Sequence, residues 1–162
     1  TDLSVSRLPA LGPRGEGWVV IQIVLLPAVA FAGLVDPLAV TPPPAIAWLV
    51  GLALMAAGAL LLGRALLDLG RNLTPVPHPR DDARLVVSGI YAHVRHPIYG
   101  GIILTAFGWS LASASLLTLG LAAVLAVFFG LKSEREEAWL RERYAGYEAY
   151  AAGTRRFVPY LL

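Results

Sequence analysis

The chain has 162 residues, of which 57% are hydrophobic and 15% charged, and its formal net charge is +2. A chain of this size has too little interior to hide so many apolar residues from water, which excludes an ordinary soluble domain and favours a membrane protein. The absence of cysteine excludes a disulfide-rich secreted scaffold, and the small, dispersed positive charge excludes a nucleic-acid-binding protein.

Three long segments contain no Asp, Glu, Lys or Arg: residues 17–35, 37–63 and 97–131. A segment in lipid must satisfy its own backbone hydrogen bonds, so each one is predicted to form helices of about 20 residues where it crosses the bilayer. The first two segments predict helices at residues 18–35 and 45–63. A run of three prolines forms a rigid connection between them.

The third segment, with 35 residues, is too long for one span. At 1.5 Å per residue a single helix would extend about 52 Å, whereas the hydrocarbon core is about 30 Å thick. A turn at residues 112–115 (Ala-Ser-Ala-Ser) divides the segment into helices at residues 97–112 and 115–131. We therefore predict a hairpin of two helices that are each somewhat short for a full crossing.

The positions of the thirteen Lys and Arg residues favour four spans over three. All of them fall within residues 7–14, 64–95 and 132–156. Four spans place these three regions on one side, the cytoplasmic side, as the positive-inside rule requires, whereas three spans would leave the basic C-terminal region outside. We predict an all-α, multi-pass integral membrane protein, a single membrane domain over residues 1–162, with both termini in the cytoplasm.

Polar residues gather in a cytoplasmic loop at residues 64–96 and in a predicted amphipathic helix at residues 133–151. Pro97 suits the first turn of a helix, which makes His96 its N-cap. The positive end of that helix dipole would lie beside Arg95. The start of the third span is therefore a candidate site for a carboxylate or phosphate.

Two adjacent carboxylates in the C-terminal helix are predicted to have different surroundings. The spacing places Glu136 on one face with a stripe formed by Leu140, Tyr144 and Tyr147. Glu137 is in register with Arg141 on another face. We predict that Glu137 is solvated and pairs with Arg141, and that Glu136 faces whatever the stripe packs on. A carboxylate in such apolar surroundings is costly unless it binds something.

Four short motifs follow one another from the loop to the C-terminal region. They are Ser88-Gly89-Ile90-Tyr91, Arg95-His96-Pro97-Ile98-Tyr99-Gly100, Glu136-Glu137 after the apolar hairpin, and Arg155-Arg156-Phe157-Val158-Pro159. Their order closely resembles the isoprenylcysteine carboxyl methyltransferase family and the related phospholipid N-methyltransferases. The resemblance covers roughly residues 69–159, while the first two spans match only as generic membrane helices.

The resemblance implies an S-adenosylmethionine site built without a Rossmann fold, between the loop, the start of the third span and the C-terminal helix. It implies Arg95 and Glu136 as catalytic residues. The implied cofactor contacts are Val76, Ala83, Arg84, Leu85, Val86, Tyr91, His96, Pro97, Ile98, Tyr99 and Glu136. Lys132 falls where the carboxyl methyltransferases have a substrate-contacting arginine. Arg64 is a candidate clamp for an anionic headgroup or carboxylate, or else an interface residue that snorkels.

The chemistry of these residues agrees with such a cofactor. S-adenosylmethionine carries a carboxylate, an ammonium and an adenine, so its site needs a cationic end, an anionic end and an apolar slot. Arg95 and His96 supply the first, and Glu136 the second. The slot would be formed by Tyr91, Ile98 and Tyr99. No metal is expected, because the three histidines have neither cysteine nor tight ligand spacing beside them.

Three functions stay open. In the first, the protein O-methylates a carboxylate of a prenylated or otherwise lipophilic acceptor and releases S-adenosylhomocysteine. The second is N-methylation of a phospholipid headgroup, for which His96 or Glu136 would be the candidate base. The third is a non-enzymatic membrane scaffold subunit in which the motifs serve packing. The expected partners are a lipophilic or lipidated acceptor and membrane lipids.

Overall fold

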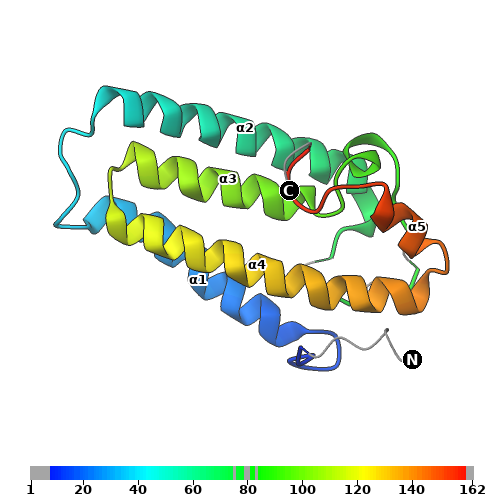
Figure 1. The fold of residues 1–162 in the computed structure, drawn as a ribbon. Helices are drawn as coiled ribbons and strands as arrows, with labels where there is room; N and C mark the ends of the chain where they lie inside the picture. Colours follow the sequence, from blue (N-terminus) through cyan, green and yellow to red (C-terminus); the bar gives the residue numbers. More distant parts are fainter. Residues whose placement is uncertain (1–7, 75, 79–80, 83, 160–162) are drawn as a thin grey trace.

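The structure, a computed structural model, describes residues 8–74, 76–78, 81–82 and 84–159. Within these ranges it is helical and has no strand. The elements in chain order are α1 (Glu16–Val35), α2 (Ala45–Leu69), the 3-10 helices η1 (Gly70–Asn72) and η2 (Gly89–Ala92), α3 (Pro97–Ala112), α4 (Leu116–Arg143) and α5 (Tyr147–Ala152). Helices α1 to α4 run alongside one another as an elongated bundle, and α5 lies at one end of it (Figure 1).

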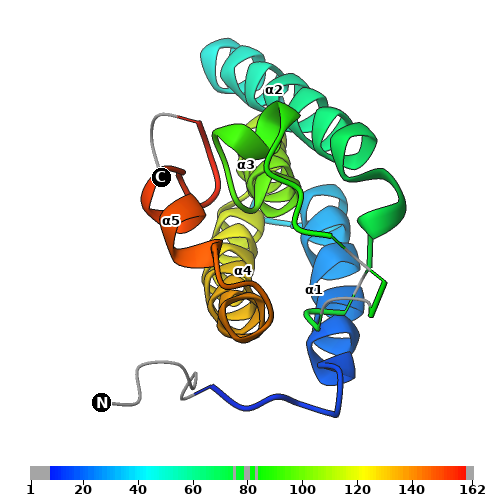
Figure 2. The same ribbon diagram turned by 90° about the vertical axis from the view of Figure 1, so that its right-hand side faces the viewer.

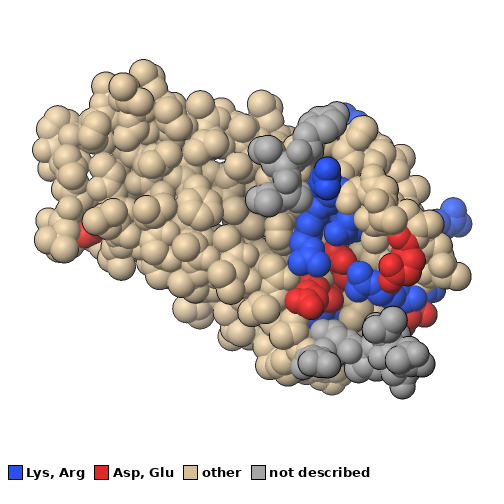
Figure 3. All heavy atoms as spheres, in the orientation of Figure 1, with Lys and Arg blue, Asp and Glu red and all other residues tan. Residues whose placement is uncertain are grey.

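Three segments are long and apolar enough to cross a membrane: Glu16–Val35, Ala45–Asn72 and Leu116–Arg143. Large apolar side chains such as Val20, Leu60 and Val127 are exposed, as expected where lipid is the solvent. Figure 3 shows charged atoms concentrated at the end of the bundle that carries α5. The prediction of an all-α membrane protein is thereby confirmed. Helix α3 is apolar but has only 16 residues, so the four-span topology and the side on which the termini lie stay predictions.

The C-terminal part of the fold differs from the two predicted helices at residues 115–131 and 133–151. Helix α4 is continuous from Leu116 to Arg143, and α5 is a separate short helix. Charged residues begin at Lys132, but the helix continues because neither proline nor glycine occurs between Lys132 and Arg143. The break comes later, where Tyr144 has an extended backbone. The aromatic stripe therefore does not lie on one helix face.

Helix α2 also continues beyond its predicted end at residue 63. Arg64 and Asp68 are one turn apart, and their side chains form an ion pair of 2.9 Å that supports the additional turns. The helix ends at Gly70, whose positive φ of 52° is a backbone conformation that glycine adopts readily. The loop therefore begins six residues later than predicted.

Small residues bring α2 and α3 into close contact. A Cβ atom added to Gly58 would lie 2.6 Å from the carbonyl oxygen of Gly101, and one added to Gly51 would lie 2.5 Å from that of Gly108. Backbones that approach this closely gain dispersion contacts, which is how helices associate in lipid, where apolar burial gives no advantage. The short helix α3 is thus held against the much longer α2.

Aromatic side chains connect the core of the bundle with its charged end. Trp18 of α1 packs on Phe128 of α4, with ring centroids 5.8 Å apart. The neighbouring Phe129 stacks on Tyr99 at the start of α3, at 4.6 Å. Seen along the bundle, α3 lies between α2 and α4, and α5 lies beside α4 (Figure 2). The charged end of the bundle therefore packs directly against its aromatic core.

Candidate functional site

A cavity of about 340 Å³ lies at the charged end of the bundle. Its walls come from segments far apart in the sequence, including α1, the end of α2, the loop, η2, the start of α3, α4 and α5. A volume of this size is within the range of pockets for small-molecule ligands. The bundle thus gathers the polar residues of several elements around one space.

Most of the residues singled out in the sequence line this cavity: Arg84, Leu85, Val86, Tyr91, Arg95, His96, Ile98, Tyr99, Lys132 and Glu136. The cavity wall does not include Val76 or Pro97, and Ala83 lies outside the described residues. Pro97 is buried in the first turn of α3, where it serves the helix start. The roles of the lining residues stay predictions.

Arg64, a predicted substrate contact, is not part of the cavity wall. Its side chain is 61% exposed and pairs with Asp68. Asp68 in turn accepts a hydrogen bond of 2.7 Å from the backbone N–H of Ile90. The structure therefore favours the interpretation of Arg64 as an interface residue that helps to anchor the loop.

Glu136 and His96 meet on the cavity wall. The hydroxyl of Tyr99 donates a hydrogen bond of 2.9 Å to Oε2 of Glu136, and Nδ1 of His96 lies 3.6 Å from the same oxygen. The imidazole of His96 also stacks on the ring of Tyr99, with centroids 5.4 Å apart. Groups of α3 thus fix the direction of the Glu136 carboxylate while it lines the cavity.

The prediction that Glu137 is solvated is wrong. Its side chain is only 1% exposed, and its Oε1 accepts a hydrogen bond of 3.0 Å from Nε of Arg95 and lies 3.1 Å from Nε2 of His96. Its Oε2 accepts one of 3.1 Å from Arg141, the partner that the i,i+4 spacing indicated. These partners offset the cost of burying the carboxylate.

Continuity of α4 explains the orientation of Glu137. Phe129, Ser133 and Glu137 follow one another at intervals of one turn, and all three are buried. The packing of the apolar part of α4 therefore sets the rotation of its charged part. A separate C-terminal helix would have been free to turn Glu137 outward.

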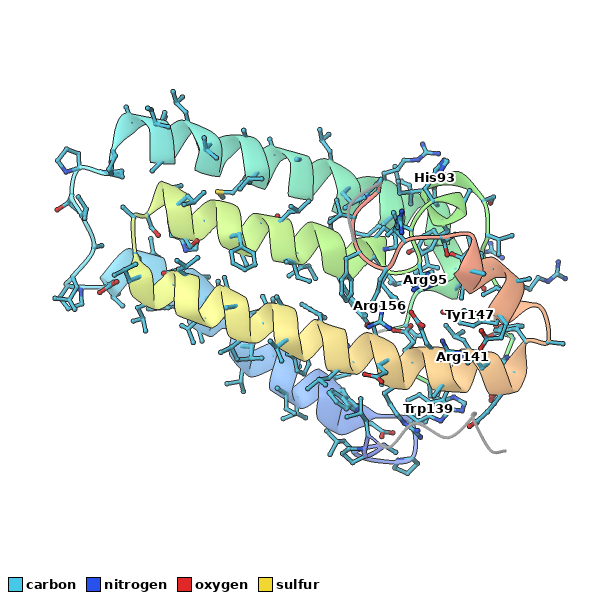
Figure 4. All side chains as sticks on the ribbon, viewed as in Figure 1. His93, Arg95, Trp139, Arg141, Tyr147 and Arg156 are labelled. Carbon is cyan, nitrogen blue, oxygen red and sulfur yellow. The ribbon has the colours of Figure 1, made fainter. Side chains whose placement is uncertain are left out.

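Arg95 joins the cavity wall to the C-terminal segment, which we define as residues 151–157. Its Nη1 donates to the carbonyl oxygens of Ala151, at 2.8 Å, and of Thr154. The backbone N–H groups of Arg95 and His96 donate to the carbonyls of Arg155 and Arg156, each at 2.8 Å. Figure 4 shows Arg95 and Arg156 between α4 and this segment. Much of the Arg95 guanidinium is thus used to hold the C-terminal segment, and its catalytic role stays a prediction.

Sequence reasoning missed Gln22 of α1. Its Oε1 accepts a hydrogen bond of 2.6 Å from Nζ of Lys132, and both residues line the cavity. Gln22 is the only amide in the charge-free segment 17–35, and a polar side chain in such a helix is costly without a partner. Other lining residues that were missed are Leu69, Asn72, Leu73 and Thr74.

Tyrosines form much of the remaining wall: Tyr91, Tyr99, Tyr144, Tyr147 and Tyr150. Burial raises the pKa of Tyr150 to about 12, and it also raises the pKa of Tyr91 and of Tyr147. These hydroxyls therefore stay protonated at neutral pH, and that of Tyr150 donates a 2.7 Å hydrogen bond to the carbonyl of Tyr91. The aromatic wall is uncharged.

Comparison with known sequences identifies the family. A family model described as phospholipid methyltransferase matches residues 46–146, well over half of the chain. The chain belongs to the phospholipid methyltransferase family. The match includes α2, α3 and α4, and it begins after α1.

Individual proteins similar to this chain are named as isoprenylcysteine methyltransferases, the family that the sequence motifs resemble. A probable protein-S-isoprenylcysteine O-methyltransferase of Oryza sativa subsp. indica is 31% identical over 116 residues, which cover 69% of this chain and 61% of that protein. The protein-S-isoprenylcysteine O-methyltransferase of Schizosaccharomyces pombe is 32% identical over 103 residues, 61% of this chain and 44% of that protein. The predicted resemblance is confirmed, and the chain spans less than two thirds of the length of these relatives.

Proposed function

We propose that this membrane protein is a methyltransferase that uses S-adenosylmethionine to O-methylate a carboxylate of a prenylated or otherwise lipophilic acceptor. One observation carries the proposal: Lys132 and Glu136, one turn apart on α4, both line a cavity at the charged end of an apolar bundle. The names of the relatives from Oryza sativa and Schizosaccharomyces pombe support the acceptor class.

The polar and apolar side chains that line the cavity suit the chemical groups of S-adenosylmethionine. The carboxylate of Glu136 suits the ammonium of the cofactor, and the positive N-terminal end of the α3 dipole suits its carboxylate. The adenine would be held by Leu85, Val86 and Tyr91, which give apolar and aromatic surface. When bound, the cofactor supplies an electrophilic methyl group on a sulfonium.

The protein residues need to orient the reactants and exclude water more than to move protons. Tyr99 and His96 hold Glu136 in place before any ligand arrives, which lowers the entropic cost of binding. A carboxylate acceptor is already nucleophilic, so it needs no general base. The uncharged tyrosine wall would keep water away from the reacting groups.

The cation on the cavity wall favours an anionic acceptor. The Lys132 ammonium attracts a carboxylate and repels a protonated amine headgroup, because like charges close together in an apolar site are costly. Leu69 of α2 and Leu140 of α4 add apolar wall suited to a lipid chain. The scaffold alternative gives no reason for charged side chains to line a cavity.

Titration and methyl transfer with the detergent-solubilised full chain test this proposal. We expect S-adenosylhomocysteine to bind, and labelled methyl from S-adenosylmethionine to pass to a farnesyl-cysteine analogue as an ester that releases methanol in alkali. If S-adenosylhomocysteine does not bind, the proposal that the protein is an S-adenosylmethionine-dependent methyltransferase is refuted. Alkali-stable labelling of phosphatidylethanolamine, with none of the analogue, would favour the N-methyltransferase instead.

A further inference from the structure

We propose that Asp68, in the last turn of α2, and Asn72, in η1, are positioning residues that hold residues 84–91 in place as the adenine wall of the cavity. We call residues 84–91 the wall segment. This inference rests on the proposed function and deepens it, because it assigns to cofactor binding two side chains that act through the backbone of the wall segment. The end of α2 would then be part of the cofactor site as well as of the bundle.

The wall segment has little regular structure of its own. Residues 84–88 belong to no helix or strand, and η2, which follows them, has only four residues. A segment of this kind has many conformations unless its neighbours fix it, and the conformational freedom that it loses on binding costs affinity. Four of its side chains nevertheless line the cavity: Arg84, Leu85, Val86 and Tyr91. What holds the segment therefore matters for the ligand.

The side chain of Asn72 holds the start of the wall segment. Its Oδ1 accepts a hydrogen bond of 3.0 Å from the backbone N–H of Arg84, 12 positions later in the chain. Its Nδ2 donates to the carbonyl oxygen of Leu69, at 3.4 Å, which fixes the direction of the amide. Leu85 and Val86 follow this fixed point directly, so their positions in the cavity wall depend on it.

The carboxylate of Asp68 holds the other end of the wall segment. Its Oδ2 accepts a hydrogen bond of 2.7 Å from the backbone N–H of Ile90, and Arg64 pairs with the same carboxylate. Hydrogen bonds to an ionised group are stronger than neutral ones. Gly89 permits this contact, because its φ is 61° and a Cβ atom there would collide with the carboxylate of Asp68. Tyr91 is the next residue after this second fixed point.

Both bonds reach the backbone of the wall segment and leave its side chains available to a ligand. The residues that accept them are four positions apart, so one short stretch of chain fixes both ends of the segment. Lys132 and Glu136 line the same cavity from α4 and do not depend on these bonds. Loss of either bond should therefore weaken the binding of the adenine part of the cofactor and spare the acceptor.

Calorimetric titration of S-adenosylhomocysteine into the detergent-solubilised full chain tests the first bond. Asn72→Ala removes the acceptor of the hydrogen bond, whereas Asn72→Asp keeps an oxygen that can accept it. Arg71→Ala is the matched control, because Arg71 is exposed in the same short helix and is not part of the cavity wall. We expect Asn72→Ala to bind about tenfold more weakly, Asn72→Asp to stay within about threefold of the wild type, and Arg71→Ala to bind normally.

Methyl transfer to the farnesyl-cysteine analogue separates positioning from a general loosening of the fold. Asn72→Ala should raise the KM for S-adenosylmethionine about tenfold, while kcat and the KM for the analogue stay within about twofold of the wild type. Its unfolding midpoint should be unchanged, because the side chain of Asn72 is only half-buried. Asp68→Ala and the conservative variant Asp68→Asn should repeat this pattern at the other end of the wall segment.

Three results overturn the inference. The first is that Asn72→Ala or Asp68→Ala binds S-adenosylhomocysteine as tightly as the wild type. The second is that Asn72→Asp binds as weakly as Asn72→Ala, and the third is that the KM for the analogue rises together with that for the cofactor. The proposed function fails separately, if the wild type binds S-adenosylhomocysteine but transfers no methyl group to the analogue, and the titrations then still decide the inference. A wild type that does not bind S-adenosylhomocysteine overturns both.

Discussion

Replacing the two adjacent glutamates of α4 separates their roles. We expect Glu137→Ala to destabilise the protein and release the C-terminal segment, whereas Glu136→Ala should leave the fold nearly intact and abolish cofactor binding. The difference follows from their surroundings. Glu137 is not part of the cavity wall and lies between Arg95, His96 and Arg141, while Glu136 lines the cavity itself.

The magnitude follows from the charges that each substitution leaves behind. Removing one partner of a buried ion pair costs about 3–5 kcal/mol, because the other charge stays buried without compensation. The side chain of Arg95 is 13% exposed and that of Arg141 31% exposed, so water screens part of the loss. We therefore expect the lower end of that range, about 3 kcal/mol, for Glu137→Ala. Glu136→Ala loses mainly the hydrogen bond from Tyr99, about 1 kcal/mol.

Unfolding in detergent micelles, followed by near-UV circular dichroism against denaturant, measures this difference. Trypsin provides a second readout, because loss of Glu137 should expose the bonds after Arg155 and Arg156 to cleavage. The matched variant Glu137→Gln keeps the shape of the side chain and should lose an intermediate amount of stability. Equal stability of the two alanine variants would refute the assignment of Glu137 to the buried network.

Three further substitutions test particular contacts. A Cβ atom on Gly100 would lie 1.9 Å from the carbonyl oxygen of Phe157, so Gly100→Ala should speed tryptic cleavage of the C-terminal segment, while Gly63→Ala, with open space around it, should not. Tyr99→Phe removes the hydroxyl that orients Glu136 and should weaken S-adenosylhomocysteine binding about tenfold in calorimetry, without a comparable loss of stability. Arg64→Ala should leave the acceptor KM unchanged in the methyl transfer assay, because the side chain lies outside the cavity.

The elements that depend on local signals could be predicted from the sequence. Charge-free segments located the apolar helices, and Pro97 marked the start of α3 at the residue where the structure begins it. The motif residues of the loop and of α4 were also expected to gather, and most of them line one cavity. Such features depend on composition and on positions close together in the chain.

The features that were missed depend on packing between distant segments. An isolated helical wheel could not give the rotation of Glu137, because the apolar part of α4 sets it many residues earlier. Gln22 was a conspicuous amide in an apolar helix, but its partner lies 110 positions away. Only the folded bundle shows which of the later polar residues it meets.

If the protein methylates the lipophilic acceptor proposed above, the unequal helix lengths would place the cavity at a suitable depth. Helix α3, with 16 residues, is about 24 Å long, shorter than a hydrocarbon core of about 30 Å. Its C-terminal end lies at the turn before α4, at the opposite end of the bundle from α5 (Figure 1). If that turn lies at one membrane surface, His96 and the cavity lie at or just inside the other. An acceptor could then present its carboxylate to Lys132 while its prenyl chain stays in the bilayer, so the short third helix would itself serve recognition.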